Sequence, residues 1–276
     1  MQDALWHYDL LLFRGRPLAP KDEVDFLTMF PHDEEAVAAG RHCNGIMANR
    51  VPGFPLLAVR GKSTVPVQWH QDKVDLPCPP ELDAMYMLRV PPRGGETLFA
   101  SASAAVEALA PERLAFLESL DCEHRSDSLF TADEGGHRID PAGVWRTDDM
   151  ESAVRRANDS PVDTKFGPPS IVHPLIIRDP RTGRRSMLYF PAFFYRFVGY
   201  SREESRAIAE ELLLGATRPE NVFTMRWQPH DFLVWNNRML LHSNTDHSMF
   251  DYPDREMHLV FLDCKVPVVP ARAAGA

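Results

Sequence analysis

Short apolar runs that end at proline or glycine recur along this 276-residue chain, and they constrain its fold more than any other feature. The run from Leu10 to Phe13 is followed by Gly15 and Pro17, and the run from Asp83 to Val90 is followed by Pro91. Apolar runs of this length between turn residues are typical of buried strands. Further strands are predicted at residues 55–60, 96–100, 171–177, 187–190, 223–228, 232–235 and 257–263.

Only a few segments favour helices. Residues 20–29, 101–109 and 111–120 are predicted to be helical, and Ser201-Arg202-Glu203-Glu204 is a capping box that begins a helix. Many short strands with a few helices between them favour an antiparallel barrel or sandwich. The length fits one large domain or two small ones, and the chain shows no internal repeat. We predict a single domain over residues 1–276.

Residues 124–170 break this pattern. They are rich in Ser, Asp, Gly, Pro and Arg and show little periodicity. A long irregular stretch inside a compact domain is either functional or disordered. We predict that this stretch is a mobile lid over a functional site and becomes ordered when a substrate binds.

The composition disfavours several function classes. The formal net charge is −9, whereas a nucleic-acid binder usually carries a basic face. No apolar run is long enough to span a bilayer, and the N-terminal residues show no secretory signal. The four cysteines are scattered, which argues against a disulfide framework or a zinc cluster. We therefore predict a cytoplasmic protein that binds neither nucleic acid nor membrane.

Side chains from two distant places in the chain are candidate metal ligands. His70 and Asp72 lie two residues apart, and His242 follows far downstream. On a strand, His70 and Asp72 would point to the same side and Gln71 would point away. Two imidazoles and one carboxylate can bind one face of a ferrous ion and leave the opposite face open, as in non-haem oxygenases.

The His-x-Asp pair is weak evidence when it is taken alone. The chain has 11 histidines, so one such tripeptide can arise by chance. A histidine on an apolar strand is more often a hydrogen-bonded core residue than a metal ligand. Spacing alone therefore leaves both interpretations of His70 and Asp72 open.

Further motifs accompany these three residues in a fixed order. They are Trp69-His70-Gln71-Asp72, Gly94-Gly95-Glu96-Thr97-Leu98-Phe99, His173-Pro174, Arg226-Trp227-Gln228-Pro229-His230-Asp231, Trp235-Asn236-Asn237-Arg238, His242 and Arg255-Glu256-Met257-His258. In this order, over residues 10–265, the chain resembles the taurine dioxygenase and 2,4-dichlorophenoxyacetate dioxygenase family of iron(II)- and 2-oxoglutarate-dependent oxygenases. The resemblance implies a mainly β fold with flanking helices around a double-stranded β-helix core of the jelly-roll, cupin-like type.

The resemblance also implies roles for individual residues. His70, Asp72 and His242 match the iron ligands, and no catalytic residue beyond them is expected. Arg255 matches the arginine that binds the distal carboxylate of 2-oxoglutarate, which a planar guanidinium can hold with two hydrogen bonds. Thr97 matches a hydroxyl that contacts the same co-substrate. Without the resemblance, Arg255 would be interpreted as a surface arginine paired with a nearby aspartate, and Thr97 as an ordinary strand residue.

The implied reaction oxidises an unactivated C–H bond of a small molecule. Hydroxylation is expected, coupled to decarboxylation of 2-oxoglutarate to succinate and carbon dioxide, with Fe(II) as the cofactor and oxygen as the second co-substrate. Related halogenases carry a small residue in place of the carboxylate ligand, so Asp72 argues against halogenation. Desaturation, ring formation and oxidative C–N chemistry stay open.

Three positions bear on the substrate. Leu259 stands four residues after Arg255, where several relatives carry a second arginine that helps to bind a sulfonate, and a leucine cannot bind one. Phe194 matches a substrate-facing phenylalanine, although core packing explains its aromatic neighbours equally well. Lys73 could place a positive charge near the substrate, although a solvated lysine is the simpler interpretation.

Several functions stay open at this point. Leu259 and the aromatic segment favour tailoring of a natural product, as in antibiotic biosynthesis. The main alternative is a catabolic dioxygenase that cleaves a sulfonate, a sulfate ester or an aryloxy acid. A non-catalytic barrel that only binds ligands, and a zinc hydrolase with the same three ligands, fit less well because Thr97 and Arg255 would then lack a purpose. The substrate is expected to be a small molecule, and a homo-oligomer is left open.

Overall fold

The computed structural model describes residues 1–32, 34–38, 50–60, 69–92, 94–124, 170–190, 193–244, 255–262 and 266–272. The predicted lid at 124–170 lies outside these residues, except for its two ends. These ends are neighbours, because His124 pairs with Ile171 across two antiparallel strands. The prediction of a lid stays a prediction.

The strands carry most of the described chain. They are β1 (Leu10–Phe13), β2 (Arg50–Val51), β3 (Phe54–Arg60), β4 (Leu82–Arg89), β5 (Thr97–Ser101), β6 (Asp121–His124), β7 (Ile171–Pro174), β8 (Ile176–Arg178), β9 (Arg185–Met187), β10 (Phe194–Phe197), β11 (Val222–Met225), β12 (Phe232–Asn236), β13 (Leu240–Asn244) and β14 (Glu256–Leu262).

The helices are short, with one exception. They are α1 (Gln2–Tyr8), α2 (Pro20–Leu27), α3 (Glu34–Ala38), α4 (Ala102–Glu107), α5 (Pro111–Glu118), the longer α7 (Arg202–Ala216) and a 3₁₀ turn at Pro219–Asn221. Within the described ranges, every helix is too short or too polar to cross a membrane.

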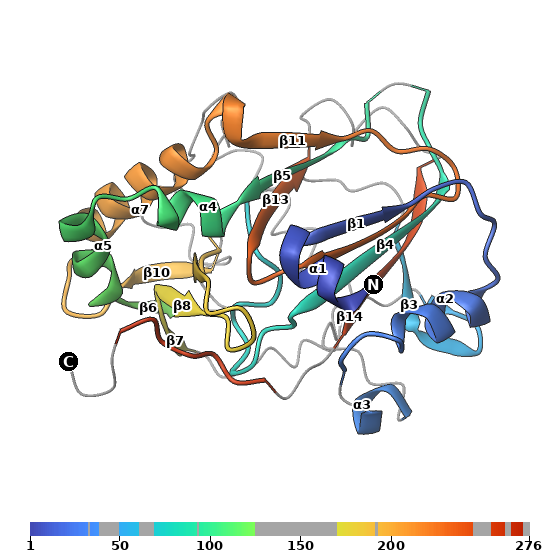
Figure 1. The fold of residues 1–276 in the computed structure, drawn as a ribbon, viewed down its shortest axis with the longest axis horizontal. Coiled ribbons are helices and arrows are strands. Elements are labelled where there is room, and N and C mark those ends of the chain that lie inside the picture. The colour runs from blue at the N-terminus through green and yellow to red at the C-terminus, as the bar shows by residue number, and fades with distance from the viewer. Residues whose placement is uncertain are drawn as a thin grey trace, which may run out of the picture.

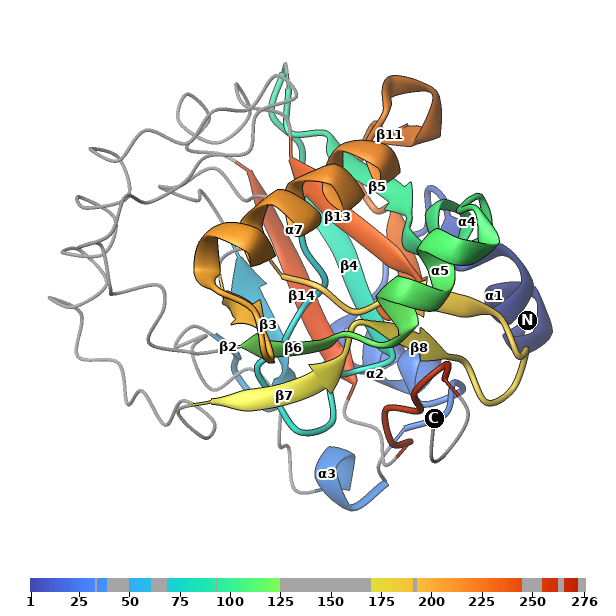
Figure 2. The same cartoon turned by 90° about the vertical axis from the view of Figure 1, so that its left-hand side faces the viewer.

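Two antiparallel sheets face each other and define the interior of the molecule. The larger sheet has the order β1-β12-β4-β14-β3-β2, and the smaller has the order β11-β5-β13. Side chains of both sheets share one buried cluster, hereafter the inter-sheet core, which includes Met87, Phe99, Met225, Trp235 and Leu259. Figures 1 and 2 show these strands at the centre of the molecule, with helices outside them. The predicted antiparallel β architecture is therefore present.

Side chains of the larger sheet alternate between its two faces. On β4, Met87 belongs to the inter-sheet core, whereas Ala84 and Tyr86 belong to a second cluster on the outer face. Leu5 of α1 and Leu27 of α2 complete that outer cluster. Successive residues of a strand point to opposite faces. Residues 84–88 of this strand therefore form an uninterrupted apolar run, because both faces of the strand are buried.

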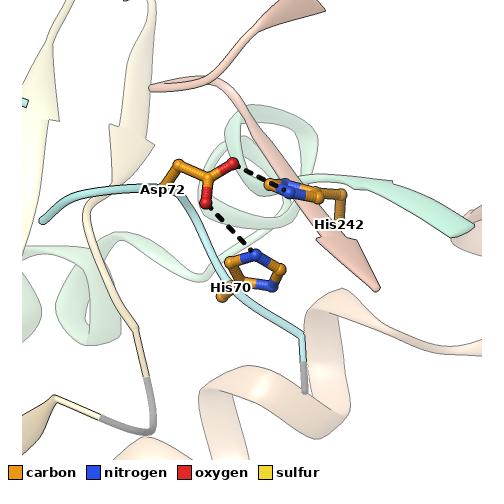
Figure 3. A group of neighbouring side chains, drawn as sticks. All are labelled: His70, Asp72 and His242. Atoms are coloured by element: carbon orange, nitrogen blue, oxygen red, sulfur yellow. Dashed lines mark ion pairs between the residues drawn. The ribbon is translucent and has the colours of Figure 1, made fainter. Parts of the chain in front are cut away.

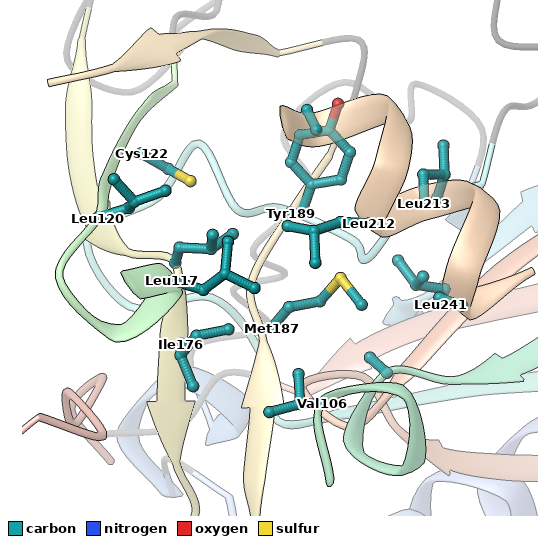
Figure 4. Packing of buried hydrophobic residues seen from close by; sticks show 14 of the residues in the cluster. Val106, Leu117, Leu120, Cys122, Ile176, Met187, Tyr189, Leu212, Leu213 and Leu241 are labelled. Carbon is teal, nitrogen blue, oxygen red and sulfur yellow. The ribbon is translucent and has the colours of Figure 1, made fainter. Parts of the chain in front are cut away.

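Helices α4, α5 and α7 cover the outer side of the smaller sheet. Figure 4 shows their side chains, among them Val106, Leu117 and Leu212, packed together with Leu241 of β13 and Met187 of β9. The predicted capping box begins α7, since the Ser201 hydroxyl accepts the Glu204 N–H at 3.2 Å and the Glu204 carboxylate accepts the Ser201 N–H at 2.9 Å. This helix wall supports β13, the strand that carries His242.

Several expectations about local structure are wrong. His70 makes one isolated β-bridge, with His242, and Asp72 lies in a turn rather than on a strand. The left-handed backbone of Lys73, with a φ of 58°, bends the chain directly after Asp72. The strand expected at 187–190 ends at Met187. Helix α1 and strand β13 were not predicted.

Candidate active site

His70, Asp72 and His242 lie together in the structure, as Figure 3 shows. Their possible ligand atoms all lie within 4.8 Å of one another. His70 Nε2 is 3.5 Å from Asp72 Oδ1, and His242 Nε2 is 3.1 Å from Asp72 Oδ2. Cis ligands that are each about 2.1 Å from an octahedral ion lie about 3 Å apart. The three side chains therefore fit one face of a metal ion.

Backbone hydrogen bonds bring the two histidines together from distant parts of the chain. The His70 N–H donates to the His242 carbonyl at 2.9 Å, and the His242 N–H donates to the His70 carbonyl at 2.8 Å. The centroids of the two rings are 4.0 Å apart. This single two-residue bridge places the start of the segment that carries Asp72 against β13.

The protonation of Asp72 and His242 suits metal binding. Burial alone would raise the pKa of the Asp72 carboxyl, but His242 and His70 beside it lower that pKa well below its usual value. Burial and then the neighbouring His70 lower the pKa of His242 to about 4. At neutral pH the site therefore offers a carboxylate and a neutral imidazole, which are the forms that bind metal ions.

Residues 70–81, hereafter the metal loop, are fixed by Asn237. Its side-chain oxygen accepts the Asp72 N–H at 2.7 Å, and its side-chain nitrogen donates to the carbonyls of Asp72 at 2.9 Å and Pro80 at 3.1 Å. Its own N–H donates to the Glu81 carbonyl at 2.7 Å. One buried amide thus holds both ends of the turn that presents the Asp72 carboxylate.

Other buried polar side chains complete this support. Gln71 points away from Asp72, as predicted, donating to the Arg238 carbonyl at 3.0 Å and accepting the Tyr189 N–H at 2.8 Å. The Arg238 guanidinium donates to the Pro79 carbonyl at 2.6 Å. His173 Nε2 lies 2.8 Å from the Leu76 carbonyl, to which it donates. The motifs around positions 173 and 235–238 therefore position the metal loop.

Aromatic rings pack against the two histidines. Phe190 lies 4.8 Å from the His70 ring, and Trp235 lies 5.2 Å from the His242 ring, as centroid distances. Phe99 of β5 stacks on His242 at 6.0 Å. These rings restrict the orientation of both imidazoles and exclude water from their faces.

Arg255 lies immediately before β14 and is only 7% exposed. A surface arginine is therefore the wrong interpretation. Burial, followed by the charge of Arg60, lowers the pKa of Arg255 to about 10, and its buried Nε has no hydrogen-bond partner. Gly95 passes close by, since a Cβ added there would lie 3.7 Å from Arg255 Nε. The Gly-Gly-Glu-Thr motif thus brings the start of β5 to this guanidinium.

Thr97 faces the same interior from the first position of β5. The buried Trp227 indole N–H donates to the Thr97 hydroxyl at 3.0 Å. An indole nitrogen can only donate, so the hydroxyl oxygen is the acceptor and its own proton stays available for another acceptor. Thr97 and Arg255 therefore both present donors that suit a carboxylate.

Two charged residues near these groups were missed by sequence reasoning. Arg60 ends β3 opposite Met257 of β14, and Asp72 lies near enough for its charge to act on the Arg60 guanidinium. Asp83 of β4 is buried beside Asp72, and burial followed by the Asp72 charge raises the pKa of Asp83 well above its usual value. Both residues are charged and occur in otherwise apolar strand patterns. A charge in such a pattern was the sequence signal that could have identified them.

The three predicted substrate residues have different surroundings. Lys73 is buried with its Nζ 3.7 Å from Asp75 Oδ1, so the solvated interpretation is wrong. Phe194 packs on the cluster under α7, with its ring 5.1 Å from that of Tyr189. Leu259 lies in the inter-sheet core. Contact of any of the three with a substrate stays a prediction.

Comparisons with known proteins decide the family. A family model described as taurine catabolism dioxygenase TauD, TfdA family matches residues 1–261. The chain belongs to this family. The resemblance seen in the ordered motifs is therefore confirmed.

Several characterised relatives are similar over most of the chain. An alkylsulfatase of Acinetobacter baylyi is 29% identical over 92% of this chain and 72% of its own length. Pentalenolactone F synthase of Streptomyces arenae is 32% identical over 75% of this chain and 65% of its own length. The (S)-phenoxypropionate/alpha-ketoglutarate-dioxygenase of Sphingobium herbicidovorans is 27% identical, with coverages of 90% and 80%.

Solved structures show the same fold. A taurine dioxygenase from Burkholderia xenovorans aligns with a TM-score of 0.71 and 25% identity, over 97% of this chain and 81% of that one. The structure of AAD-2 in complex with Mn(II) and N-oxalylglycine aligns with a TM-score of 0.68 and 21% identity, over 97% and 87%. The predicted jelly-roll, cupin-like core with flanking helices is confirmed.

The family also confirms the predicted class of enzyme. Its members are 2-oxoglutarate-dependent dioxygenases, which use Fe(II), 2-oxoglutarate and oxygen. The His-Asp-His group gives this chain a ligand set that suits a ferrous ion. The role of each single residue stays a prediction.

Proposed function

We propose that the protein hydroxylates an unactivated C–H bond of a small organic molecule while it decarboxylates 2-oxoglutarate to succinate and carbon dioxide. The observation that carries the proposal is the presence of two kinds of polar group inside one barrel. A His-Asp-His group and two buried hydrogen-bond donors, Arg255 and Thr97, which have no acceptor among the described residues, lie in the same barrel.

In this proposal His70, Asp72 and His242 would hold the ferrous ion. Three protein ligands on one face leave positions for a chelating co-substrate and for oxygen. When bound, the iron supplies the oxygen activation that no amino-acid side chain can supply. Because the Asp72 carboxylate occupies the third position, hydroxylation is expected rather than halogenation.

Arg255 and Thr97 would bind the distal carboxylate of 2-oxoglutarate. The guanidinium can donate two parallel hydrogen bonds, and burial strengthens its attraction for an anion. Thr97 can add a third bond because Trp227 already occupies its acceptor side. Gly95 keeps space open beside Arg255, since a side chain there would press against Pro91 at 2.7 Å and approach Arg255 at 3.7 Å.

For the substrate we propose a natural product or one of its precursors. The similarity to pentalenolactone F synthase of Streptomyces arenae supports this choice. A catabolic role on a sulfate ester or an aryloxy acid is the second candidate, supported by the alkylsulfatase and phenoxypropionate dioxygenase relatives. A succinate-release screen over terpenoid lactones, alkyl sulfates and aryloxy acids separates the two candidates by which class is turned over.

We further propose a cytoplasmic enzyme with a small-molecule substrate and neither nucleic-acid nor membrane partners. The net charge of −9 supports this, as do the scattered cysteines, of which Cys78 and Cys122 are free thiols. Light scattering on the purified protein tests whether it forms a homo-oligomer.

The experiment that tests the proposed activity is anaerobic titration with Fe(II) and 2-oxoglutarate. A metal-to-ligand absorption band in the visible range is expected to appear only when both are present. The Arg255→Met variant is expected to retain iron but to weaken 2-oxoglutarate binding by about 100-fold, since a buried charge-assisted pair is lost. Arg89→Met is the matched control, because Arg89 pairs with Glu256 on the surface directly beside this site. No band in the wild type would refute the proposed function.

A further inference from the structure

We propose that Arg60 binds an oxyanion of the primary substrate, such as a carboxylate or a sulfate group, beside the metal ligands. This inference rests on the function proposed above and adds to it a residue that selects the substrate. Neither the ordered motifs nor the proposed roles of Arg255 and Thr97 account for a guanidinium at this position.

The strand register directs Arg60 into the barrel. On β14, Met257 and Leu259 both belong to the inter-sheet core. Their partners on β3 are Arg60 opposite Met257 and Ala58 opposite Leu259. Directly paired residues of two antiparallel strands project to the same face of a sheet. Arg60 therefore shares the interior face with Met257, and the neighbour two residues before it on β3 is the small Ala58.

The charges of the described residues around Arg60 are its nearest electrostatic influences. Among the described residues, no acidic side chain forms a direct ion pair with Arg60, and the carboxylate whose charge reaches it is Asp72, a proposed iron ligand. The second cation nearby is Arg255, whose pKa Arg60 lowers further after burial has done so. Arg255 is buried and Arg60 is partly exposed, and two like charges that lie near each other favour the binding of anions.

The co-substrate satisfies only one of these two cations. Its distal carboxylate would neutralise Arg255, where Thr97 and Gly95 converge, and its other carboxylate would lie on the iron together with Asp72. Arg60 would then be the unneutralised charge near the reacting centre. Its close neighbours Met257, Leu259 and Ala58 are apolar. A ligand with an apolar body and one anionic group fits this combination.

The test compares matched probes on the anaerobic enzyme loaded with Fe(II) and 2-oxoglutarate. Hexyl sulfate and hexanoate carry the anion, and 1-hexanol has the same chain without it. Calorimetry on the wild type is expected to show at least tenfold tighter binding of an anionic probe than of 1-hexanol. In Arg60→Met this preference is expected to disappear while the affinity for 1-hexanol is unchanged, and Arg60→Lys is expected to retain part of it.

The affinity for 2-oxoglutarate separates the alternatives. Arg60→Met is expected to retain the visible iron–2-oxoglutarate band and its titration midpoint, whereas Arg255→Met loses affinity. If Arg60→Met weakens 2-oxoglutarate as strongly as Arg255→Met does, Arg60 serves the co-substrate and the inference is overturned. It is also overturned if the wild type shows no anionic preference.

Failure of the inference and failure of the proposed function are distinguishable. A normal iron–2-oxoglutarate band without any anionic preference refutes only the role of Arg60. Absence of the band refutes the proposed function itself. If Arg60→Met does not fold, the comparison is made with Arg60→Gln and Arg60→Lys, of which only the lysine variant is expected to prefer the anionic probes.

Discussion

The two ends of the active site are built on opposite principles. At the metal end, Asn237 and Arg238 form hydrogen bonds with the backbone of the metal loop, and Gln71 ties the loop to the backbone of Arg238 and Tyr189. At the co-substrate end, Arg255 and Arg60 are cations without direct protein partners among the described residues. The first end is completed by the protein, whereas the second would be completed by ligands in the proposed function. Stability and binding should therefore respond differently to mutations at the two ends.

The largest effect is expected when a metal ligand is removed. His242→Ala should lower the affinity for Fe(II) by at least about 1,000-fold, equivalent to about 4 kcal/mol, and abolish succinate release. Anaerobic iron titration followed by metal analysis measures this. His7→Ala, at an exposed histidine of α1, is the control and should bind iron normally. Normal iron binding by His242→Ala would show that the metal end lies elsewhere.

The next effect tests whether the metal end depends on its backbone support. Asn237→Ala removes three side-chain hydrogen bonds from a fully buried site, and should cost about 2–4 kcal/mol of unfolding free energy. It should also weaken iron binding by about 10–100-fold, although it touches no proposed ligand side chain. Asn221→Ala, which removes one exposed bond to Gly215, is the control and should change both quantities little. Unaltered iron affinity would show that the loop holds its shape without Asn237.

The third effect concerns the co-substrate end and uses two glycines with the same backbone angle. Gly95 and Gly53 both have a φ of 81°, but a Cβ at Gly95 would lie 2.7 Å from Pro91, whereas nothing lies within 4 Å at Gly53. Gly53→Ala should cost about 1 kcal/mol from backbone strain alone. Gly95→Ala should cost roughly 1–3 kcal/mol more from overpacking.

The affinity for 2-oxoglutarate should also distinguish Gly95→Ala from Gly53→Ala. Because the added methyl group in Gly95→Ala crowds the surroundings of Arg255, co-substrate affinity should fall, whereas iron affinity should stay normal. Chemical denaturation and the visible iron–2-oxoglutarate band measure the two quantities. Equal stability and equal co-substrate affinity of the two variants would contradict the close packing at Gly95.

The smallest effect is a pH dependence on the metal side. His124 is buried, and neither of its ring nitrogens forms a hydrogen bond with a described residue. Burial followed by the neighbouring His173 lowers its pKa to about 3. Above the unfolded pKa of about 6.5, this histidine is neutral in both the folded and the unfolded protein and costs no stability. As the pH falls from 6.5 towards 3, the unfolded state binds a proton that the folded state does not bind, and the free energy of unfolding decreases. When the pH is lowered from 7.5 to 5.5, the free energy of unfolding of His124→Leu should therefore rise by about 1.4 kcal/mol relative to that of the wild type.

Thermal melts at the two pH values measure this difference. His7→Leu, at an exposed site, is the control, and its difference in stability from the wild type should be the same at both pH values. A pH-independent difference between His124→Leu and the wild type would mean that folding does not lower the pKa of His124. Since His173 joins β7 to the metal loop through Leu76, acid should loosen the metal end before the co-substrate end.

Much of the fold was predictable because its signals are local. Strands such as β4 and β14 are buried on both faces, so they appear as apolar runs that end in turns. Helix α7 was predictable from its capping box. Strand β13 was not, because Leu240 to Asn244 changes from apolar to polar within five residues and its pairing partner β5 lies about 140 residues upstream in the chain. Long-range pairing leaves no local signal in a single sequence.

The sequence by itself determined the family and the fold and predicted a candidate set of metal ligands, since residue type and order carry that information. The tertiary structure decided how the parts are held. It placed Asp72 in a turn fixed by Asn237, engaged Lys73 with Asp75 and turned Arg60 into the barrel through its register with β14. The position of Asp72 and the direction of Arg60 depend on pairings between segments far apart in the chain. Such pairings set which charges face the barrel interior, so these charges can be read only from the folded molecule.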